Sequence, residues 1–346
     1  MNLCQLRQAD LEKRILKHRE KTGCVIIPFM FEANFQTTLL ASLRMLLMGA
    51  VGYYVIRQRI VSEAILNALN DLIVYLFLPC LILYDFFDKF SFAAYGKWWI
   101  FPLLGVVVSL TGLVVGGAVS SLISSKEKRN QFLSLCAFQN SGYIPLLIVQ
   151  SILKPQDAQE MYMYIFLFLV GFNFLIWSLG AKLISGEERS ILSLKDFYNP
   201  PILATIVALV MIYFRMHHFI PLVVLDSLGS FGSCMMPLAI LVVGGSLATI
   251  KLDERQYFKD VILAVGTKLF IFPALVLAGL VFFKVQSLLG LLLIIEAAVP
   301  SAVTLTVVAK YYHKDETFIN QTIFYSHIVG LVTLPLFLIL YQRMVG

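Results

Sequence analysis

The stretch LCAFQNSGYIPLLI, residues 135–148, interrupts a long apolar run with polar and helix-disfavouring residues. Five such residues fall within seven positions: Gln139, Asn140, Ser141, Gly142 and Pro145. Proline removes a backbone donor and disfavours helical geometry at the residue before it. Non-helical backbone at membrane depth is tolerated only where protein or a water-filled cavity covers it. The stretch therefore predicts a broken membrane helix that borders a site.

The composition places the whole chain in the membrane. Of 346 residues, 59% are hydrophobic and 14% are charged, and the mean hydropathy is +0.83. A soluble domain carries about 25% charged residues. Apolar runs of about 20 residues, long enough to span a bilayer as helices, recur along the chain. We expect an all-α polytopic membrane protein, whose net charge of +6 reflects topology rather than nucleic-acid binding.

Hydropathy and helix-breaking residues together predict ten membrane-spanning helices. Their expected ranges are 35–56, 64–87, 98–124, 131–152, 160–184, 199–214, 222–249, 259–283, 287–311 and 317–342. Lysine and arginine are more frequent in the loops on one side, and the positive-inside rule makes that side cytoplasmic. Both termini then lie outside the cytoplasm. The expected location is the cell membrane, with an intracellular membrane as the alternative.

The basic residues within 1–29 conflict with this orientation. One interpretation is that natural translation starts at Met30, so that 1–29 is a non-native tail. The alternative is an amphipathic helix on the membrane surface. The sequence does not choose between them.

Prolines recur at matching places in the two halves. Pro79 and Pro237 lie about as far apart as Pro145 and Pro300, and the offset indicates a duplication of about 155 residues. A unit of five spans is odd, so its second copy enters the membrane from the opposite side. We therefore predict two inverted five-helix repeats, 30–185 and 199–346, joined by a cytoplasmic linker, 186–198.

The second half contains a break that matches the first. In IEAAVPSAVTLT, residues 295–306, Pro300 and Ser301 lie well inside the ninth span. Paired interruptions at corresponding positions are the best sequence indication of a transporter site, and half-helix N-termini suit an anionic substrate. We predict that the substrate is bound by residues at both breaks: Asn140, Ser141, Gly142, Pro145, Pro300 and Ser301.

Charged and polar residues deep in the spans extend this site. Glu296 lies one helical turn before Pro300 and either ligates Na⁺ together with freed carbonyls or carries a proton as a neutral acid. Alternatively, Glu296 forms a structural ion pair with Lys268. Lys268 either balances Glu296 or attracts a substrate carboxylate, and Asn173 either contacts substrate or joins helices by hydrogen bonds.

Two further groups have both a site interpretation and a structural one. Asp71, with Asn67 and Asn70, either lines a cytoplasmic vestibule or caps and hydrates a helix end. His327 in the tenth span either faces the site or joins neighbouring helices by hydrogen bonds.

Four motifs in order carry a family resemblance: NSGYIPL, NPPILATIVALV (199–210), PLAILVVGGSLA (237–248) and EAAVPSAVTLTVVAKYY (296–312). They resemble the auxin efflux carrier family, over roughly residues 30–346. The resemblance implies ten helices, with the fourth and ninth unwound and crossing near the midplane, as in bile-acid-symporter-like folds. The spacing Asn140-x-Gly142-x-x-Pro145 is similar to that of PIN-like carriers, whereas bacterial members more often carry extra residues before the proline.

The predicted function is secondary active transport of a small organic anion by alternating access, such as an auxin-like or dicarboxylic acid. Two alternatives stay open: a sodium-coupled bile-acid-type symporter and a transporter-like sensor that does not translocate its ligand. The sequence contains no GxxxxGK[ST], HExxH or GxSxG motif, so we expect neither an ATP-driven pump nor an enzyme. No cofactor is expected beyond Na⁺ or H⁺ as coupling ion. The expected partners are the organic anion, the lipid bilayer and a second copy in a homodimer, and no nucleic acid is expected.

Overall fold

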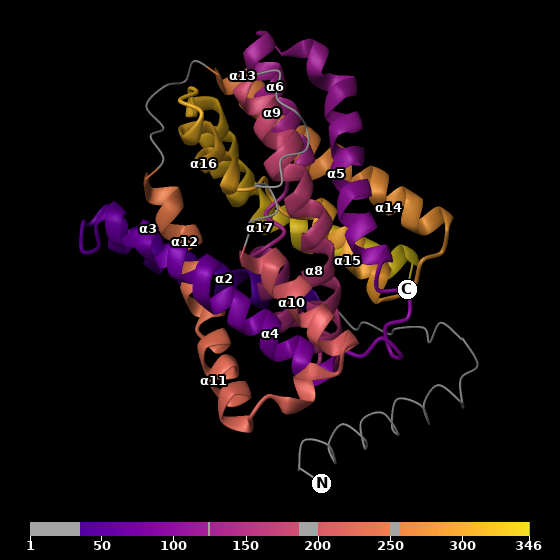
Figure 1. The fold of residues 1–346 in the computed structure, drawn as a ribbon. Helices are drawn as coiled ribbons and strands as arrows, with labels where there is room; N and C mark the ends of the chain where they lie inside the picture. Colours follow the sequence, from indigo (N-terminus) through magenta and orange to yellow (C-terminus); the bar gives the residue numbers. More distant parts are fainter. Residues whose placement is uncertain (1–34, 124, 187–199, 250–256, 346) are drawn as a thin grey trace.

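The computed structural model describes residues 35–123, 125–186, 200–249 and 257–345, and these ranges contain helices and no β-strand (Figure 1). The predicted all-α class is thereby confirmed. The predicted tail 1–29 and nearly all of the predicted linker 186–198 lie outside the described residues. The proposed division into two repeats therefore stays a prediction.

The first half of the chain contains helices that alternate with short connections. They are α2 (Phe35–Arg57), α3 (Glu63–Leu72), the π-helical turn η1 (Ile73–Phe77), α4 (Leu78–Lys89), α5 (Ile100–Val119), the 3₁₀ turn η2 (Ser120–Leu122), α6 (Lys126–Ala137), α7 (Ile144–Ile152), α8 (Pro155–Leu175), the π-helical turn η3 (Ile176–Gly180) and α9 (Ala181–Ser185).

In the second half of the chain, helices again alternate with short connections. It contains α10 (Pro200–Tyr213), the 3₁₀ turn η5 (Met216–Phe219), α11 (Leu222–Ser233), α12 (Met235–Thr249), α13 (Phe258–Gly266), the π-helical turn η7 (Thr267–Ile271), α14 (Phe272–Phe282), α15 (Leu288–Ala298), α16 (Thr304–Tyr311) and α17 (Thr317–Val345).

Six helical segments of the described chain are long and apolar enough to cross a membrane. They are Glu63–Lys89, Ile100–Leu122, Pro155–Ser185, Leu222–Thr249, Phe258–Phe282 and Thr317–Val345. The expected fourth and ninth spans are not among them, because each is divided into two short helices: α6 and α7, and α15 and α16. Apolar α10 has 14 residues and is also shorter than a full span.

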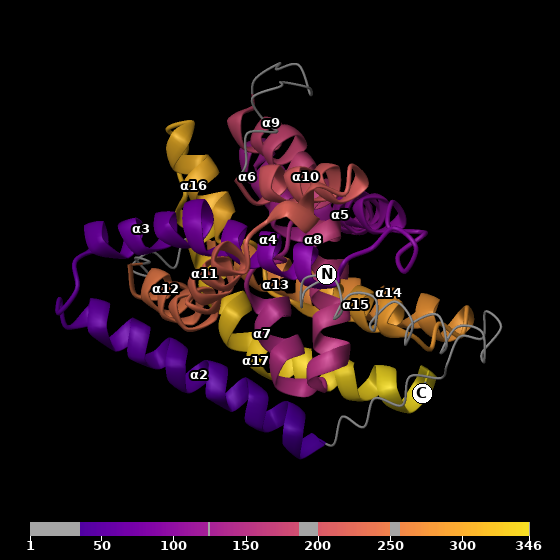
Figure 2. The same cartoon turned by 60° about the horizontal axis from the view of Figure 1, so that its bottom comes forward.

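The contacts between helices define two groups, whose members are labelled in Figures 1 and 2. In the first, which we call the panel, α2 packs along α12, and α10 and α11 both pack along α4. In the second, which we call the bundle, α5 packs on α8 and α6, and α17 packs on α13, α14 and α15. The panel thus comprises α2, α3, α4, α10, α11 and α12, and the other described helices, including the short α7 and α16, form the bundle.

Glycine permits the tightest contact in the panel. A Cβ atom built on Gly244 of α12 would fall on the backbone of Gly49 in α2, and one on Gly52 would fall on the backbone of Leu241. Small residues let membrane helices approach closely where no hydrophobic driving force exists between them. The Gly49–Gly244 contact therefore sets the distance between α2 and α12.

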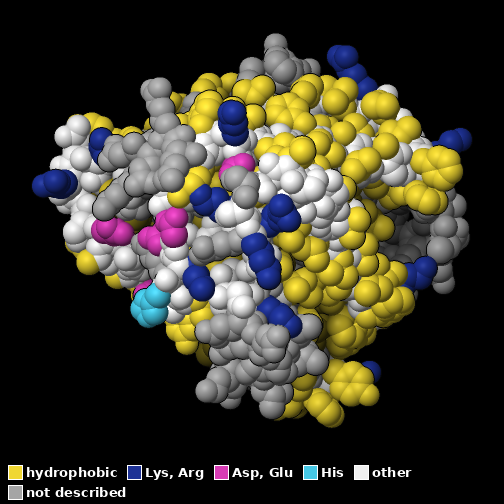
Figure 3. Space-filling model, turned by 90° about the horizontal axis from the view of Figure 1, so that it is seen from above, with side chains coloured by type: hydrophobic (Ala, Val, Ile, Leu, Met, Phe, Trp, Pro, Cys, Tyr) yellow, Lys and Arg dark blue, Asp and Glu magenta, His cyan; other side chains and the backbone are white. Residues whose placement is uncertain are grey.

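One end of the molecule carries scattered basic side chains (Figure 3). Helices α6, α9 and α16 lie at this upper end in Figure 1, and Lys126, Lys182 and Lys314 belong respectively to the start of α6, the end of α9 and the segment after α16. The view shows lysine and arginine mixed with acidic and uncharged side chains over the middle of this face, with hydrophobic side chains around them toward its edges. Such an arrangement is typical of a membrane protein's interfacial surface. That this end faces the cytoplasm stays a prediction.

Candidate functional site

The two helix breaks meet in the interior. Between α6 and α7, Gln139 forms an isolated antiparallel bridge with Ser301, which lies between α15 and α16. The Asn140 N–H donates to the Pro300 carbonyl at 2.8 Å, and the Ala302 N–H donates to the Phe138 carbonyl at 3.0 Å. These hydrogen bonds satisfy backbone groups that the breaks would leave buried without partners. The breaks are therefore one paired unit, which we call the bridge.

Four helix ends converge on the bridge. The chain reaches it from the C-termini of α6 and α15, and leaves it into the N-termini of α7 and α16. Helix C-termini carry partial negative charge and N-termini partial positive charge. The bridge thus combines two cation-favouring ends with two anion-favouring ends. Pro145 lies in the first turn of α7, where its missing N–H costs no helical hydrogen bond.

Glu296 lies in the last turn of α15, and its side chain contacts the bridge. Its carboxyl is fully buried, at 0% exposure. The Ser141 hydroxyl donates to its Oε2 atom at 2.6 Å, and the Gln139 amide donates to the same atom at 3.4 Å. The other oxygen, Oε1, has no hydrogen-bond partner in the described part of the chain. Glu296 thus fixes the first break to the second.

Asn140 joins the bridge to α17. Its Nδ2 atom lies 3.4 Å from Nε2 of His327, and the Nδ1 atom of His327 lies 2.8 Å from the Ile323 carbonyl. A carbonyl accepts only from a protonated Nδ1, which leaves Nε2 of the neutral ring as the acceptor. The Asn140 amide therefore donates to His327. Both side chains are buried.

A polar cavity of about 280 Å³ lies where the bridge faces the panel. Four predicted site residues line it: Asn140, Ser141, Gly142 and Asn173. The vestibule candidates Asn67, Asn70 and Asp71 also line it, as do Gln139, Tyr143, Trp177, Ser246 and Thr304. The structure thus brings polar groups from α3, α8, α12 and both breaks to one space.

The other predicted site residues do not line this cavity. Pro145 is buried in α7, and the Ser301 hydroxyl donates to the Leu135 carbonyl at 2.8 Å. Glu296 lies behind Ser141, and Lys268 is buried in η7 without an ion-pair contact to Glu296 among the described residues. The direct Glu296–Lys268 ion pair that the sequence offered as an alternative is therefore not observed.

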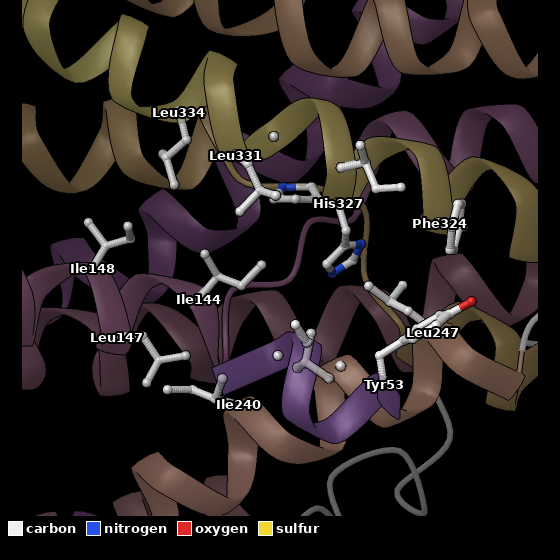
Figure 4. Close-up of a pocket in the computed structure, with 17 residues that line it drawn as sticks. Tyr53, Ile144, Leu147, Ile148, Ile240, Leu247, Phe324, His327, Leu331 and Leu334 are labelled. Carbon is white, nitrogen blue, oxygen red and sulfur yellow. The ribbon is translucent and has the colours of Figure 1, made fainter. Parts of the chain in front are cut away.

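A second cavity, of about 340 Å³, is almost wholly apolar (Figure 4). It lies between α2 and α12 of the panel and α7 and α17 of the bundle. Pro300 lines it, and His327 projects into it from α17 among Ile144, Leu247 and Phe324. The His327 ring therefore lines the apolar cavity and contacts Asn140, which lines the polar cavity.

The charge of the polar cavity is unusual for an anion site. Asp71 is its acidic lining residue, and its described lining contains no lysine or arginine. An anion bound there would be stabilised by amide donors and by the N-termini of α7 and α16. Tyr143, at the start of α7, donates through its hydroxyl to Asn70 at 3.3 Å and so connects the bundle to the panel.

Sequence reasoning did not select Gln139 or Tyr143 as substrate-binding residues, and it left His327 with both a site interpretation and a structural one. Gln139 directly precedes Asn140 in the same polar run, so its position in the sequence could have identified it as a residue of the first break. His327 is 187 positions from Asn140, and no local pattern links the two. Its role depends on how α17 packs against the bridge.

Known membrane transport proteins are similar to this chain in sequence. The sequence model of a family described as membrane transport protein matches residues 38–338. An uncharacterized transporter of Methanocaldococcus jannaschii is 24% identical over 302 residues, which cover 84% of this chain and 94% of that protein. Protein PIN-LIKES 2 of Arabidopsis thaliana is 28% identical over 97 residues, covering 28% of this chain and 21% of that protein.

Proposed function

The chain belongs to the membrane transport protein family, the family of auxin efflux carriers, and from this premise we propose that it is a secondary active transporter of a small organic anion. The resemblance drawn from the sequence is thereby confirmed, and the chain is a multi-pass membrane protein of a transport family. In our proposal, the substrate binds in the polar cavity beside the bridge. The bridge, with its two broken helices, is the observation that carries this proposal.

The packing supports a ten-helix arrangement of two inverted repeats. In the proposed duplication, α10 is the counterpart of α2, and α4 is the counterpart of α12. Accordingly, α2 packs along α12 and α10 packs along α4. Likewise α5 packs along α8, and α13 and α14, which together are the counterpart of α5, pack along α17, the counterpart of α8. A duplication with opposite membrane orientation produces such reciprocal contacts and places the two breaks at the repeat interface.

The donors at the cavity suit a carboxylate. The N-termini of α7 and α16 point at the bridge, and Asn140 and Asn173 supply neutral amide donors, whereas the Ser141 hydroxyl already donates to Glu296. Backbone N–H groups at a helix N-terminus bind anions without a full positive charge. Because Asp71 opposes binding of a highly charged anion, we expect one carboxylate to be recognised more strongly than two.

The position of the cavity supports alternating access. It is lined from the panel by α3, η1 and α12, and from the bundle by α8 and both breaks. A movement of the bundle against the panel would change access to the bridge without breaking either group. The panel and the bundle are therefore the two bodies of the proposed cycle.

Counterflow in proteoliposomes tests the proposal. Purified protein is reconstituted with internal unlabelled indole acetate or malate, and uptake of the same labelled acid is followed. We expect saturable uptake by the wild type and at least a tenfold loss in Asn140→Ala and Glu296→Gln, because both changes remove contacts at the bridge. Ser151→Ala is the matched control, since its hydroxyl bonds only to the Leu147 carbonyl in its own helix.

A thermal-shift measurement on the same variants separates transport from sensing. An acid that raises the Tm of the wild type should not raise that of Asn140→Ala or Glu296→Gln. If the acid stabilises the wild type but never crosses the membrane, the chain is a sensor. Equal ligand shifts in wild type and both variants would remove the bridge as the binding site.

A further inference from the structure

We propose that the apolar cavity between panel and bundle holds one acyl chain of an acidic membrane phospholipid, whose phosphate group is bound at Arg57. This lipid site is separate from the polar cavity, and the inference does not depend on the proposed transport function. Its argument rests on three features: the lining of the cavity, its opening toward the bilayer, and the charge beside that opening.

The lining of the cavity suits a hydrocarbon chain. Its volume of about 340 Å³ lies within the range of small-molecule sites, about 300–1,000 Å³. Apart from His327 and Tyr53, the described lining carries no polar side chain. Both ring nitrogens of His327 already have partners, the Asn140 amide and the Ile323 carbonyl. A carboxylate inside would lose its hydration without a buried donor to replace it, so the part of a ligand that enters must be apolar.

The cavity opens toward lipid between α2 and α17. Ala50 and Tyr53 of α2 and Ile328 of α17 line the cavity and are also exposed at the protein surface. Beside them, Val51 and Val332 are exposed hydrophobic residues of the same two helices. Lipid tails are as apolar as such side chains, so a surface of this kind faces hydrocarbon. An acyl chain can therefore enter from the bilayer without crossing water.

The opening lies near the level of the lipid headgroups. Tyr53 and Tyr54 are exposed just before Arg57, the last residue of α2, and exposed tyrosines of this kind mark the membrane interface. On α17 the lining extends from Phe324 to Leu334, which is about 15 Å of helix and about half of the hydrocarbon thickness. Figure 4 shows Tyr53 and Phe324 at one end of the cavity and Leu334 at the other. The cavity thus extends from the headgroup level into one leaflet, as an acyl chain does.

A basic side chain lies where the phosphate group of such a lipid would be. Arg57 follows Tyr53 by four positions, so the two residues share one face of α2. Arg57 is exposed and forms no ion pair with another residue of the described chain. A guanidinium group binds phosphate oxygens through two parallel hydrogen bonds. Charge complementarity therefore favours an acidic phospholipid over a zwitterionic one.

Native mass spectrometry and Tm measurements on the purified, delipidated full chain in detergent test the site. The protein is titrated with phosphatidylglycerol, with phosphatidylcholine, or with glycerol 3-phosphate, which has a phosphate group but no acyl chain. We expect the wild type to retain one phosphatidylglycerol, with a saturable rise in Tm of about 3 °C or more. Phosphatidylcholine should need a concentration about fivefold higher or more, and glycerol 3-phosphate should give no rise. An equal response to either of these two would overturn the proposal.

Two pairs of variants test whether the cavity holds the chain. Ala50→Phe and Ile328→Trp place a ring at the opening from α2 and from α17, and each should abolish retention of phosphatidylglycerol. Val51→Phe and Val332→Trp are the matched controls, because these exposed positions do not line the cavity, and both should retain the lipid as the wild type does. Two variants on different helices keep the test valid if one of them fails to fold. Equal retention within the pairs would overturn the site.

A third pair tests the headgroup. Arg57→Gln should raise the half-saturating concentration of phosphatidylglycerol about fivefold and leave that of phosphatidylcholine unchanged. Arg215→Gln is the control, since Arg215 is exposed after α10 and does not line the cavity. An unchanged affinity in Arg57→Gln would overturn the role of Arg57. Displacement of phosphatidylglycerol from the wild type by indole acetate would also overturn the proposal, because the cavity would then bind the organic anion. Lipid retention is read without transport, so these results are independent of the counterflow outcome.

Discussion

Three hydrogen-bonding side chains hold the centre of this protein together. Ser141 and Gln139 both donate to one oxygen of Glu296, and Asn140 donates to His327. All these side chains are buried, and a buried polar group that loses its partner costs more than the hydrogen bond itself contributed. Single substitutions at the bridge therefore act on stability and on the site together.

Removal of one hydroxyl at the bridge tests its energetic importance. Ser141→Ala deletes the 2.6 Å hydrogen bond to Glu296, and we expect a loss of roughly 1–3 kcal/mol in the free energy of unfolding. Thermal unfolding in detergent measures this loss. Ser151→Ala, whose hydroxyl bonds within its own helix at 2.8 Å, should change stability by less than about 0.5 kcal/mol. Equal effects of the two changes would contradict the assigned role of Ser141.

At the scale of the helices, two features depart from continuous helices packed through large side chains: the two helix breaks and the close glycine contact between α2 and α12. Pro145 and Pro300 accompany the two breaks, and the bridge restores the backbone hydrogen bonds that the breaks remove. Elsewhere Gly49 and Gly244 allow α2 and α12 to touch along their backbones. The breaks create the site, and the glycine contact holds α2 and α12 of the panel close together beside it.

The glycine contact makes a prediction for helix packing. Gly244→Ala places a methyl group on the backbone of Gly49, so α2 and α12 must separate. We expect a stability loss of about 1–3 kcal/mol, typical of overpacking. In contrast, Gly117→Ala in α5 meets no atom within 4 Å and should be neutral or slightly stabilising, because alanine is the better helix former. Thermal unfolding of both variants is the measurement, and a stable Gly244→Ala would show that the contact is not limiting.

For the whole molecule, the interface between panel and bundle decides function. The polar cavity and the apolar cavity both lie on this interface. Contacts across it include the 3.3 Å hydrogen bond between Tyr143 and Asn70. An interface lined by two cavities is less tightly packed than a protein core, which suits relative movement of two bodies.

Cross-linking the interface should stop transport. In Asn70→Cys/Tyr143→Cys, mercury(II) can join the two thiols and fix α7 to α3. We expect counterflow to fall at least tenfold on mercury addition and to return with excess dithiothreitol. Each single cysteine variant, treated in the same way, should show no further loss of counterflow on mercury addition relative to its own untreated activity, because one thiol cannot join α7 to α3. Undiminished transport after complete cross-linking would contradict movement between panel and bundle.

Orientation in the membrane is a second prediction for the whole molecule. Cysteines placed at Lys126 or Lys314 should react with an impermeant maleimide only after the membrane is opened, because the basic end is predicted to be cytoplasmic. A cysteine at Lys97 or Lys284 should react in intact cells. Labelling in a cysteine-free background, followed by a mass-shift assay, reads both outcomes. The reversed pattern would invert the topology without changing the fold.

The sequence by itself determined the helical class, the membrane setting and the positions of both breaks. These features follow from local chemistry: apolar runs of bilayer length, and prolines with polar neighbours that cannot continue a helix. It also pointed to Asn140, Ser141, Gly142 and Asn173, which the structure places around one cavity. The family resemblance rested on motifs whose order is itself a property of the sequence.

Only the tertiary structure decided which distant residues meet. It paired Gln139 with Ser301, Asn140 with His327 and Ser141 with Glu296, across separations of 155 or more positions for the two side-chain pairs. It also placed Lys268 behind the bridge and away from both cavities, without a direct ion pair to Glu296. The physical reason is that such contacts depend on helix packing, and residue spacing along a chain carries no information on which faces of distant helices turn toward each other.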